Sequence, residues 1–211
     1  MILYGYWRSS AAYRIRIALG LKGLAYSSVP VDLAGGAQSA AAFLAVNPQG
    51  LVPVLDDGGV VVAQSPAILE YLEETRPRPP LLPAGAAARA DVRRLAAMVA
   101  CDIHPLGNAR VLRALRGDFG ADDAAVAAWV HRWIGAGFGA LEALLAGRDG
   151  RFCHGDSPTL ADVCLVPQMY NARRFGLDLA PYPTLVRIDA ACCELPAFAA
   201  AAPERQPDCP E

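Results

Sequence analysis

The apolar positions in the first 75 residues follow two periods, the alternation of a strand and the wider spacing of a helix. Residues 1–4 form an apolar run typical of a short buried strand, and residues 14–21 have the spacing of an amphipathic helix. Residues 25–31 predict a second strand, and residues 37–45 predict a short helical stretch. This order indicates a βαβ unit at the start of the chain.

A β-hairpin and a further helix follow this unit. Two apolar runs, residues 52–55 and 60–63, flank Asp56-Asp57-Gly58-Gly59, which is typical of a tight turn between antiparallel strands. Ser65 is the expected N-cap of the next helix, with Pro66 at its first helical position. The first part of the chain therefore has the predicted order βαβ–ββα.

A proline-rich stretch then separates this part from the rest of the chain. Four prolines fall within seven residues, at Pro77, Pro79, Pro80 and Pro83. Neither a helix nor a central strand could cross such a stretch, so it predicts a stiff linker. Beyond it the apolar spacing is helical, over residues 87–115, 122–146, 160–175 and 185–194.

The predicted fold class is thus α/β plus all-α, in three consecutive parts. They are an N-terminal domain over residues 1–76, the proline-rich linker over residues 77–86 and an all-helical domain over residues 87–211. Residues 203–211 at the end of the chain are expected to form a poorly ordered tail.

Composition and charge exclude several classes of partner. The chain has 211 residues, 54% of them hydrophobic, enough for one large or two modest cores. A formal charge of −2 and a pI of about 5.9 provide no attraction to nucleic acid or anionic lipid. The uncharged stretch over residues 33–55 contains glycines and prolines, so it is not a membrane helix. Arg8, Arg14 and Arg16 interrupt any apolar leader, and we expect a cytoplasmic protein.

The six cysteines indicate neither a disulfide framework nor a metal site. No C-x-x-C motif and no Cys/His pair has the spacing of zinc ligands. Cys101 and Cys164 lie in apolar helical patterns, where a free cysteine acts as a small hydrophobic side chain. We therefore expect reduced thiols and no bound metal.

The candidate chemistry starts with Arg8, Ser9 and Ser10, between the first strand and the first helix. Free backbone N–H groups and the positive end of the dipole favour an anion at a helix N-terminus. A serine there can cap the helix or donate a hydrogen bond to a bound thiolate. Capping needs only one of the two serines and leaves Arg8 unexplained. By contrast, Thr159-Leu160-Ala161-Asp162 is a capping box, which we interpret as a folding device.

This organisation resembles that of the soluble glutathione transferases. The residues that carry the resemblance are Val52-Pro53, Gln64-Ser65, and Gly155 with the capping box. Within that superfamily, Arg8-Ser9-Ser10 with the following helix is similar to the zeta class, the maleylacetoacetate isomerases. Further matches lie at Asn47-Pro48, Asp102-Ile103-His104-Pro105, Asn108, residues 172–175 and residues 181–183.

The resemblance implies a fold, a cofactor and a reaction. It implies a thioredoxin-like N-terminal domain, a helical glutathione-transferase domain, a homodimer, and glutathione as cofactor. The implied reaction is the cis–trans isomerisation of maleylacetoacetate to fumarylacetoacetate. Glutathione-dependent maleylpyruvate isomerases are close relatives, so both substrates stay open. The implied cofactor-binding residues are Ser9, Ser10, Gln38, Val52, Pro53, Gln64, Ser65, Asp102, His104 and Asn108.

Some of these residues have specific expected roles. Ser9 is the first choice for the thiolate partner, with Ser10 second, and Pro53 is expected to be cis. Because His104 and Asn108 are one helical turn apart, they are expected to face the same way.

Three arginines are the expected carboxylate ligands of the substrate, since a planar guanidinium binds a carboxylate through two hydrogen bonds. They are Arg8, Arg110 and Arg174, and Arg8 is also counted among the catalytic residues. Arg173 is expected to be a solvated neighbour.

The chain departs from the family at Ala11, where a cysteine commonly follows the two serines. A mechanism that uses a protein thiol at this position is thereby excluded, and the sulfur nucleophile has to come from glutathione. Two other functions remain open on sequence. One is a general transferase that conjugates glutathione to small electrophiles, and the other is a non-catalytic module of the same fold.

Overall fold

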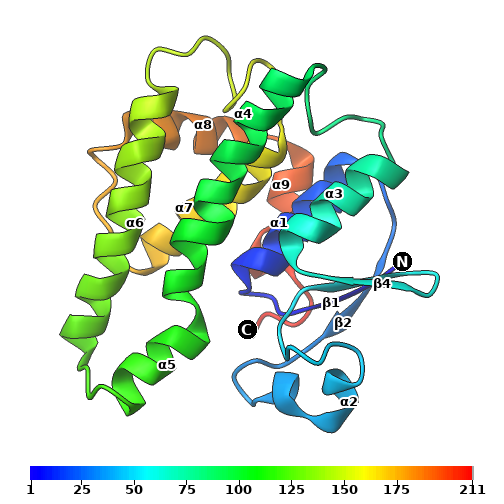
Figure 1. Ribbon diagram of the computed structural model, residues 1–211, viewed down its shortest axis with the longest axis vertical. Helices are drawn as coiled ribbons and strands as arrows, with labels where there is room; N and C mark the ends of the chain where they lie inside the picture. The colour runs from blue at the N-terminus through cyan, green and yellow to red at the C-terminus, as the bar shows by residue number, and fades with distance from the viewer. Residues whose placement is uncertain (211) are drawn as a thin grey trace. The chain divides into compact units, whose positions relative to one another are not determined.

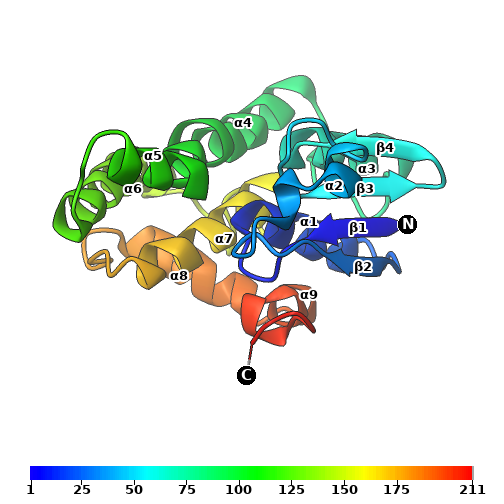
Figure 2. The same cartoon turned by 90° about the horizontal axis from the view of Figure 1, so that it is seen from below.

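A four-stranded sheet organises the N-terminal part of the chain in the computed structural model, which describes residues 1–210. The strands are β1 (Ile2–Gly5), β2 (Ser27–Pro30), β3 (Val54–Asp57) and β4 (Val60–Ala63). Figure 2 shows them side by side in the order β2-β1-β3-β4. β1 pairs with β2 in parallel and with β3 antiparallel, and β3 and β4 form the expected hairpin.

Helices cover both faces of this sheet (Figure 1). α1 (Ser10–Leu21) and α3 (Ser65–Thr75) lie on one face. The short η1 (Ala37–Ser39) and α2 (Ala41–Leu44) occupy the other. Val31, Phe43 and Val54 form the small core beneath α2.

The first helix is not amphipathic, contrary to the prediction. Every residue from Ala11 to Leu19 is buried, including Arg14 and Arg16. The helix packs against α3 on one side and α9 (Pro196–Ala201) on the other. The contact with α9 is close, since a Cβ at Gly20 would lie 3.2 Å from the Cβ of Ala197. This second cover comes from the far end of the chain, so the spacing of apolar residues in α1 could not reveal it.

The only lysine ties the start of the linker to the sheet domain. Lys22 is buried, its Nζ donates to the carbonyls of Arg76 and Pro79, and it pairs with Glu73 at 3.4 Å. Glu73 in turn accepts from the backbone N–H of Leu81 at 2.9 Å. The linker is therefore held by charged side chains as well as stiffened by its prolines.

The chain forms two compact units. Unit 1 comprises Met1–Leu81 with the described residues from Glu194 onward, and unit 2 comprises Leu82–Cys193. The predicted helical domain over residues 87–211 includes the segment after Glu194, whereas the structure groups that segment with the sheet. The predicted poorly ordered tail is wrong for residues 203–210, because η4 (Pro203–Arg205) forms there and Asp208 bonds to Trp7. Glu211 lies outside the described residues.

Unit 2 is helical, as predicted. Its elements are α4 (Ala86–Ala97), η2 (Met98–Ile103), η3 (His104–Gly107), α5 (Ala109–Gly117), α6 (Asp123–Leu145), α7 (Leu160–Arg174) and α8 (Pro183–Cys193). The single helix predicted over residues 87–115 is wrong. The α-helix ends at Ala97, a wider π-helical turn follows, and α5 starts anew after the extended residue Asn108. Within residues 1–210, no helix is both long enough and apolar enough to cross a membrane.

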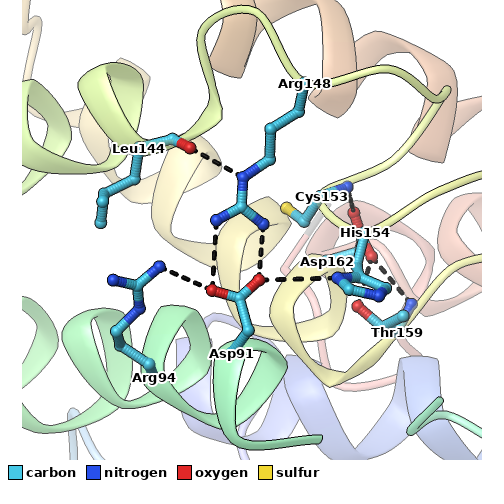
Figure 3. A network of polar contacts seen from close by, with 8 residues as sticks. All are labelled: Asp91, Arg94, Leu144, Arg148, Cys153, His154, Thr159 and Asp162. Atoms are coloured by element: carbon cyan, nitrogen blue, oxygen red, sulfur yellow. Dashed lines mark hydrogen bonds and ion pairs between the residues drawn. The ribbon is translucent and has the colours of Figure 1, made fainter. Parts of the chain in front are cut away.

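Two carboxylates, the half-buried Asp91 and the buried Asp162, form the polar network of unit 2 drawn in Figure 3. Asp91 of α4 accepts from Arg148 at 2.5 and 3.1 Å and from Arg94 at 2.6 Å. The Arg148 hydrogen bond holds the pKa of Asp91 well below its usual range, with a further contribution from Arg94. His154 Nδ1 lies 3.5 Å from the same carboxylate.

The second carboxylate, Asp162, confirms the capping box. It accepts from the backbone N–H of Thr159 and of Cys153, both at 2.8 Å (Figure 3). Burial raises the pKa of Asp162, and these two N–H groups oppose the shift. The box therefore also holds the loop that precedes α7.

The six cysteines are free thiols in different surroundings. Cys164 is buried, as expected of a small hydrophobic side chain, but Cys101 is exposed, so the same prediction is wrong for it. Burial raises the pKa of Cys153 and Cys192 far above the ordinary thiol value, and raises that of Cys193 to about 11. These three side chains stay protonated at neutral pH and are poor nucleophiles.

Candidate functional site

Ser9 begins the first helix with its side chain and its backbone. Its φ and ψ of −70° and 116° are extended, and its Oγ accepts from the N–H of Ala12 at 3.2 Å. Its carbonyl accepts from the N–H of Tyr13 at 2.8 Å. Ser9 is therefore the N-cap. Because Oγ acts as the acceptor in this bond, the hydroxyl proton remains available to a ligand.

The neighbours of Ser9 are placed by the same turn. Ser10 is the first residue of α1 and, like Ser9, is partly exposed. Arg8 is exposed, with its guanidinium 5.2 Å from the centre of the Trp7 ring. Ala11, in the position of the family's cysteine, is 8% exposed. Unit 1 thus presents two hydroxyls and a cation at one helix N-terminus.

A second helix N-terminus lies at Gln64 and Ser65. The expected N-cap was Ser65, but the structure makes Gln64 the N-cap and moves Ser65 and Pro66 one position into α3. Gln64 has a φ of 71°, which is the left-handed region that non-glycine residues rarely adopt. Such strained residues are concentrated at functional sites. The Gln64 Nε2 donates to Gln49 Oε1 at 2.6 Å.

Ser65 has a buried partner that the sequence analysis did not assign. Nη1 of Arg14, a side chain only 1% exposed, donates to Ser65 Oγ at 3.1 Å. Ser65 itself is 3% exposed. The arginine at position 14, within an otherwise apolar helical run, was the signal in the sequence that could have indicated this buried contact. Its burial, however, depends on α3 and α9.

The loop before β3 contributes backbone groups to the candidate site. The Val52-Pro53 peptide bond is cis, which confirms the expectation. Asn47 fixes this loop, since its Nδ2 donates to the Leu51 carbonyl at 2.7 Å and its Oδ1 accepts from the Gln49 N–H at 3.1 Å. Asn47, which sequence matching placed in the family pattern without a role, is thus a structural residue of this loop.

Gln38 lies beside the same loop. A Cβ at Gly50, whose φ is 64°, would come within 3.1 Å of the Gln38 carbonyl, so only glycine fits there without strain. Oε1 of Gln38 is buried and has no hydrogen-bond partner within residues 1–210. A buried acceptor without a partner is rare in folded proteins and fits a site that receives a hydrogen-bonding ligand.

These contacts link the candidate residues of unit 1 to one another. Gln38 meets the loop at Gly50, the loop meets Gln64 through Gln49, and Ser65 meets α1 through Arg14. The structure therefore links α1, the α3 N-terminus, the loop before β3 and Gln38 by direct contacts within unit 1.

The other candidates lie in unit 2, and their predicted arrangement needs a correction. His104 and Asn108 do not share a helix, because His104 begins η3 and Asn108 is extended, with a ψ of 143°. Asn108 caps α5, its Oδ1 accepting from the Arg110 N–H at 3.1 Å. Asp102 and Arg110 are exposed, and His104 is partly exposed. Pro105 has no N–H to continue a helix, which is consistent with the break.

Arg174 lies at the end of α7 and is held by Asn171. Its Nη2 and Nε donate to Asn171 Oδ1 at 2.8 and 3.3 Å, and its guanidinium lies 4.3 Å from the centre of the Phe175 ring. Asn171 is buried and also lies beside η3, since a Cβ at Gly107 would be 4.0 Å from its Nδ2. Asn171 is therefore a positioning residue that the sequence analysis missed.

Arg173 is exposed, as expected of a solvated neighbour of Arg174, and it also forms an ion pair. Its Nη2 lies 2.6 Å from Oδ2 of the buried Asp189 and joins α7 to α8. Arg8 belongs to unit 1, whereas Arg110 and Arg174 belong to unit 2. Their convergence on one substrate stays a prediction. Among residues 1–210 no group of histidine, cysteine and acidic side chains is arranged to hold a metal ion.

Comparison with known proteins places this arrangement in a family. The family description "Glutathione S-transferase, N-terminal domain" matches residues 1–74. The maleylpyruvate isomerase of a Ralstonia species is 56% identical over 99% of this chain and 99% of its own length. The maleylacetoacetate isomerase of Rhizobium meliloti is 53% identical over 97% of this chain and 96% of its own.

Solved structures agree with this placement. A holo structure of a maleylpyruvate isomerase, described as a bacterial zeta-class glutathione S-transferase, covers the whole chain with a TM-score of 0.98 and 55% identity; both chains are fully covered. The Methylobacterium extorquens maleylacetoacetate isomerase, with bound malonate and glutathione, has a TM-score of 0.96 and 46% identity over both whole chains.

A third structure carries a modified cofactor. The Anaeromyxobacter dehalogenans maleylacetoacetate isomerase, with dicarboxyethyl glutathione and citrate in its active site, has a TM-score of 0.88 and 50% identity, over 99% of this chain and 97% of its own. The predicted fold class is confirmed by this set. The chain belongs to the zeta class of the glutathione transferases, the family of the maleylacetoacetate and maleylpyruvate isomerases.

Proposed function

We propose that this chain is a glutathione-dependent cis–trans isomerase that converts maleylacetoacetate to fumarylacetoacetate. The observation that carries the proposal is the turn at the α1 N-terminus, where the Ser9 hydroxyl proton is available beside the exposed Arg8. Curated relatives more than half identical over almost their whole length are isomerases of maleyl keto acids. We also expect a homodimer that acts in the cytoplasm.

The first task of the site is to hold glutathione as its thiolate. A thiol with an ordinary pKa of about 8.5 needs about 1.4 to 2.7 kcal/mol of preferential stabilisation to lower that pKa by one to two units. A helix N-terminus supplies up to about 2 kcal/mol, and a hydrogen bond to a charged group adds about 1.5 to 3 kcal/mol. The Ser9 hydroxyl at the start of α1 is therefore sufficient without a general base.

The remaining residues of unit 1 fit the rest of the tripeptide. The α3 N-terminus, with Gln64 and Ser65, is suited to the γ-glutamyl carboxylate. The backbone of Val52, next to the cis Pro53, is suited to the cysteinyl unit. The unpartnered Oε1 of Gln38 supports a place for that residue at the glycyl end.

The helical unit supplies the other proposed ligands. Asp102, His104 and Asn108 are proposed as further cofactor ligands. These roles rest on the match of the three residues to the family pattern.

The second task is to bind a substrate with two carboxylates. Arg8, Arg110 and Arg174 are proposed to hold them, since guanidinium groups bind carboxylates through paired hydrogen bonds. When bound, glutathione supplies a thiolate that adds reversibly to the cis alkene, permits rotation about the resulting single bond, and leaves to give the trans product. The arginines and the backbone N–H groups of the α1 N-terminus stabilise the negative charge that develops on the substrate. The dicarboxyethyl glutathione in a relative supports this chemistry, because thiol addition to an unsaturated diacid yields such a group.

Maleylpyruvate is a second candidate substrate. The Ralstonia relative and the structure with a TM-score of 0.98 are both maleylpyruvate isomerases, which favours it specifically. Both substrates have a cis alkene between a carboxylate and a ketone, so the same residues serve either.

The proposal is tested by giving the purified protein each maleyl keto acid with and without glutathione. We expect loss of the substrate's enol absorbance only when glutathione is present, with the thiol fully recovered at the end. Stoichiometric consumption of glutathione by a chlorinated substrate, without isomerisation, would instead identify a conjugating transferase. A protein that does not bind glutathione in calorimetry would be the non-catalytic module.

A further inference from the structure

The loop Tyr6–Ser9, which carries Arg8 and Ser9, is held by side chains from distant segments. The N–H of Trp7 donates to Asp208 Oδ2 at 2.8 Å, across 201 positions of sequence. The Trp7 carbonyl accepts from Arg16 Nη2 at 3.0 Å. The Tyr6 carbonyl accepts from the Ser9 N–H at 2.9 Å and from Arg16 Nη1 at 3.5 Å.

Arg16 joins this loop to the C-terminal segment. Its Nε donates to the Ala201 carbonyl, at the end of α9, at 3.0 Å, and the residue is only 5% exposed. Burial lowers the pKa of Arg16 to about 10, and the nearby Tyr26 and Asp208 side chains oppose part of that shift. Arg16 therefore remains a cation at neutral pH, beneath the loop and near the Asp208 carboxylate.

Residues 6–8 of this loop belong to no regular secondary structure, and Ser9 is held as the N-cap of α1. The loop lies between the last residue of β1 and the first of α1, so strand pairing does not restrain it. The side-chain contacts to Tyr6 and Trp7 therefore hold the part of the loop that precedes Ser9, while the bonds of Ser9 to the N–H groups of Ala12 and Tyr13 join the loop to the start of α1. Trp7 also carries the ring over which Arg8 is stacked. A displacement of Trp7 would move both the proposed thiolate donor and a proposed carboxylate ligand.

We propose that Asp208 and Arg16 are positioning residues that fix the Tyr6–Ser9 loop, so that the end of the chain determines how Ser9 meets the glutathione sulfur. The inference rests on the proposed function, because Ser9 is the thiolate partner only in that function. The two residues act through the loop backbone and touch neither cofactor nor substrate. Rates are sensitive to displacements of about 1 Å, with effects of about a hundredfold, so such support matters for catalysis.

The test compares Asp208→Ala with Asp208→Asn, whose side-chain oxygen can still accept from the Trp7 N–H. Gln206→Ala is the matched control, because Gln206 lies in the same segment but bonds to Ala200 and Ala202 and not to the loop. Amide hydrogen exchange at Trp7 is measured without glutathione. Thiolate absorbance is then titrated against pH in the binary complex, and kcat and melting temperature are recorded.

Asp208→Ala is expected to speed exchange at Trp7 and to raise the midpoint of thiolate formation by about one pH unit. The expected loss in kcat is about tenfold. Asp208→Asn and Gln206→Ala are expected to resemble the wild type in Trp7 exchange, in the midpoint of thiolate formation and in kcat. Wild-type exchange at Trp7 and an unchanged thiolate midpoint in Asp208→Ala would overturn the proposal. So would equal losses in Asp208→Ala and Gln206→Ala, because these would show a general anchor of the chain end.

The two hypotheses fail in different ways. If the wild-type protein does not bind glutathione, the proposed function is wrong. The proposed effect of Asp208 and Arg16 on the glutathione thiolate is then wrong as well. If glutathione binds and turns over while Asp208→Ala keeps the wild-type midpoint, only the positioning role is wrong. Should Asp208→Ala not fold, Arg16→Lys takes its place, because lysine lacks the two guanidinium hydrogen bonds to the Tyr6 and Trp7 carbonyls. The same exchange and titration criteria apply to it.

Discussion

The geometry of Ser9 allows one hydroxyl group to cap the helix and to donate to a ligand. Its oxygen caps α1 by accepting from Ala12, and its proton is left for a ligand. The capping interpretation and the thiolate interpretation therefore do not compete at this residue. Ser10, the first residue of the helix, has no such capping bond, so comparing the two serines separates helix capping from thiolate binding.

Ser9→Ala is expected to lower kcat at least tenfold, since one hydrogen bond to developing charge is worth several kcal/mol. It should also destabilise the protein by about 1 kcal/mol through loss of the cap. Steady-state kinetics and thermal unfolding measure the two effects. Ser9→Thr, which keeps the hydroxyl, should retain both, and an unchanged rate in Ser9→Ala would remove its assigned role.

Arg14 is linked to the proposed site by Ser65, whose Oγ accepts its hydrogen bond. With that acceptor position occupied, the Ser65 proton is directed elsewhere, toward a carboxylate in the proposed function. The buried cation also adds positive potential near the start of α3.

Arg14→Met is expected to weaken glutathione binding about tenfold, the loss of one hydrogen bond to a charged group. Binding of cysteinylglycine, which lacks the γ-glutamyl carboxylate, should be unchanged. Calorimetry on Arg14→Met, Ser65→Ala and the double variant measures the coupling. Strictly additive losses would show that Arg14 does not act through Ser65.

Two carboxylates of unit 2 hold the segment between α6 and α7 through several polar contacts. Asp91 on α4 joins three basic side chains, one from its own helix and two from the segment that connects α6 to α7 (Figure 3). Asp162 closes the capping box of α7 and also accepts from Cys153. The start of α7 and the preceding loop are thus held together by two carboxylates.

Asp91→Asn is expected to lower the free energy of unfolding by about 2 kcal/mol at neutral pH, because hydrogen bonds to charged groups are lost. The Arg148 hydrogen bond lowers the folded-state pKa of Asp91, so its contribution is complete above the ordinary value of about 4. The contribution is lost as pH falls through the lowered value. Denaturant unfolding should therefore show a constant difference between variant and wild type from about pH 5 to 8 that narrows only in strong acid. Asp123→Asn is the control, since the Asp123 side chain is 94% exposed and its pair with Arg116 contributes little.

At the scale of the molecule, we expect a homodimer of this 22.2 kDa chain. Val60 and Val61 on the edge strand β4 are each 50% exposed, which is apolar surface of the kind that subunit interfaces cover. Light scattering on the purified protein should give twice the chain mass at micromolar concentration. A mass of one chain that persists as concentration rises would contradict the dimer.

Local signals allowed much of this fold to be predicted from the chain. The turn at residues 56–59, the capping box at Thr159 and the βαβ–ββα order each depend on residues a few positions apart. Such features can be predicted from a few neighbouring residues, because the energies of helix capping and of turn conformation depend on residues close in sequence. The cis peptide at Pro53 and the choice of Ser9 followed from resemblance to a family.

Contacts between distant segments could not be predicted in this way. Whether Arg14 and Arg16 are solvated or buried depends on α3 and α9, and the hydrogen bond from Trp7 in the Tyr6–Ser9 loop goes to Asp208, 201 positions away. The interruption of the predicted helix before Asn108 belongs to the same class. Burial and long-range hydrogen bonds form between surfaces that meet only when the chain folds. The spacing of apolar residues along α1 is therefore the same whether one face of the helix is covered or both.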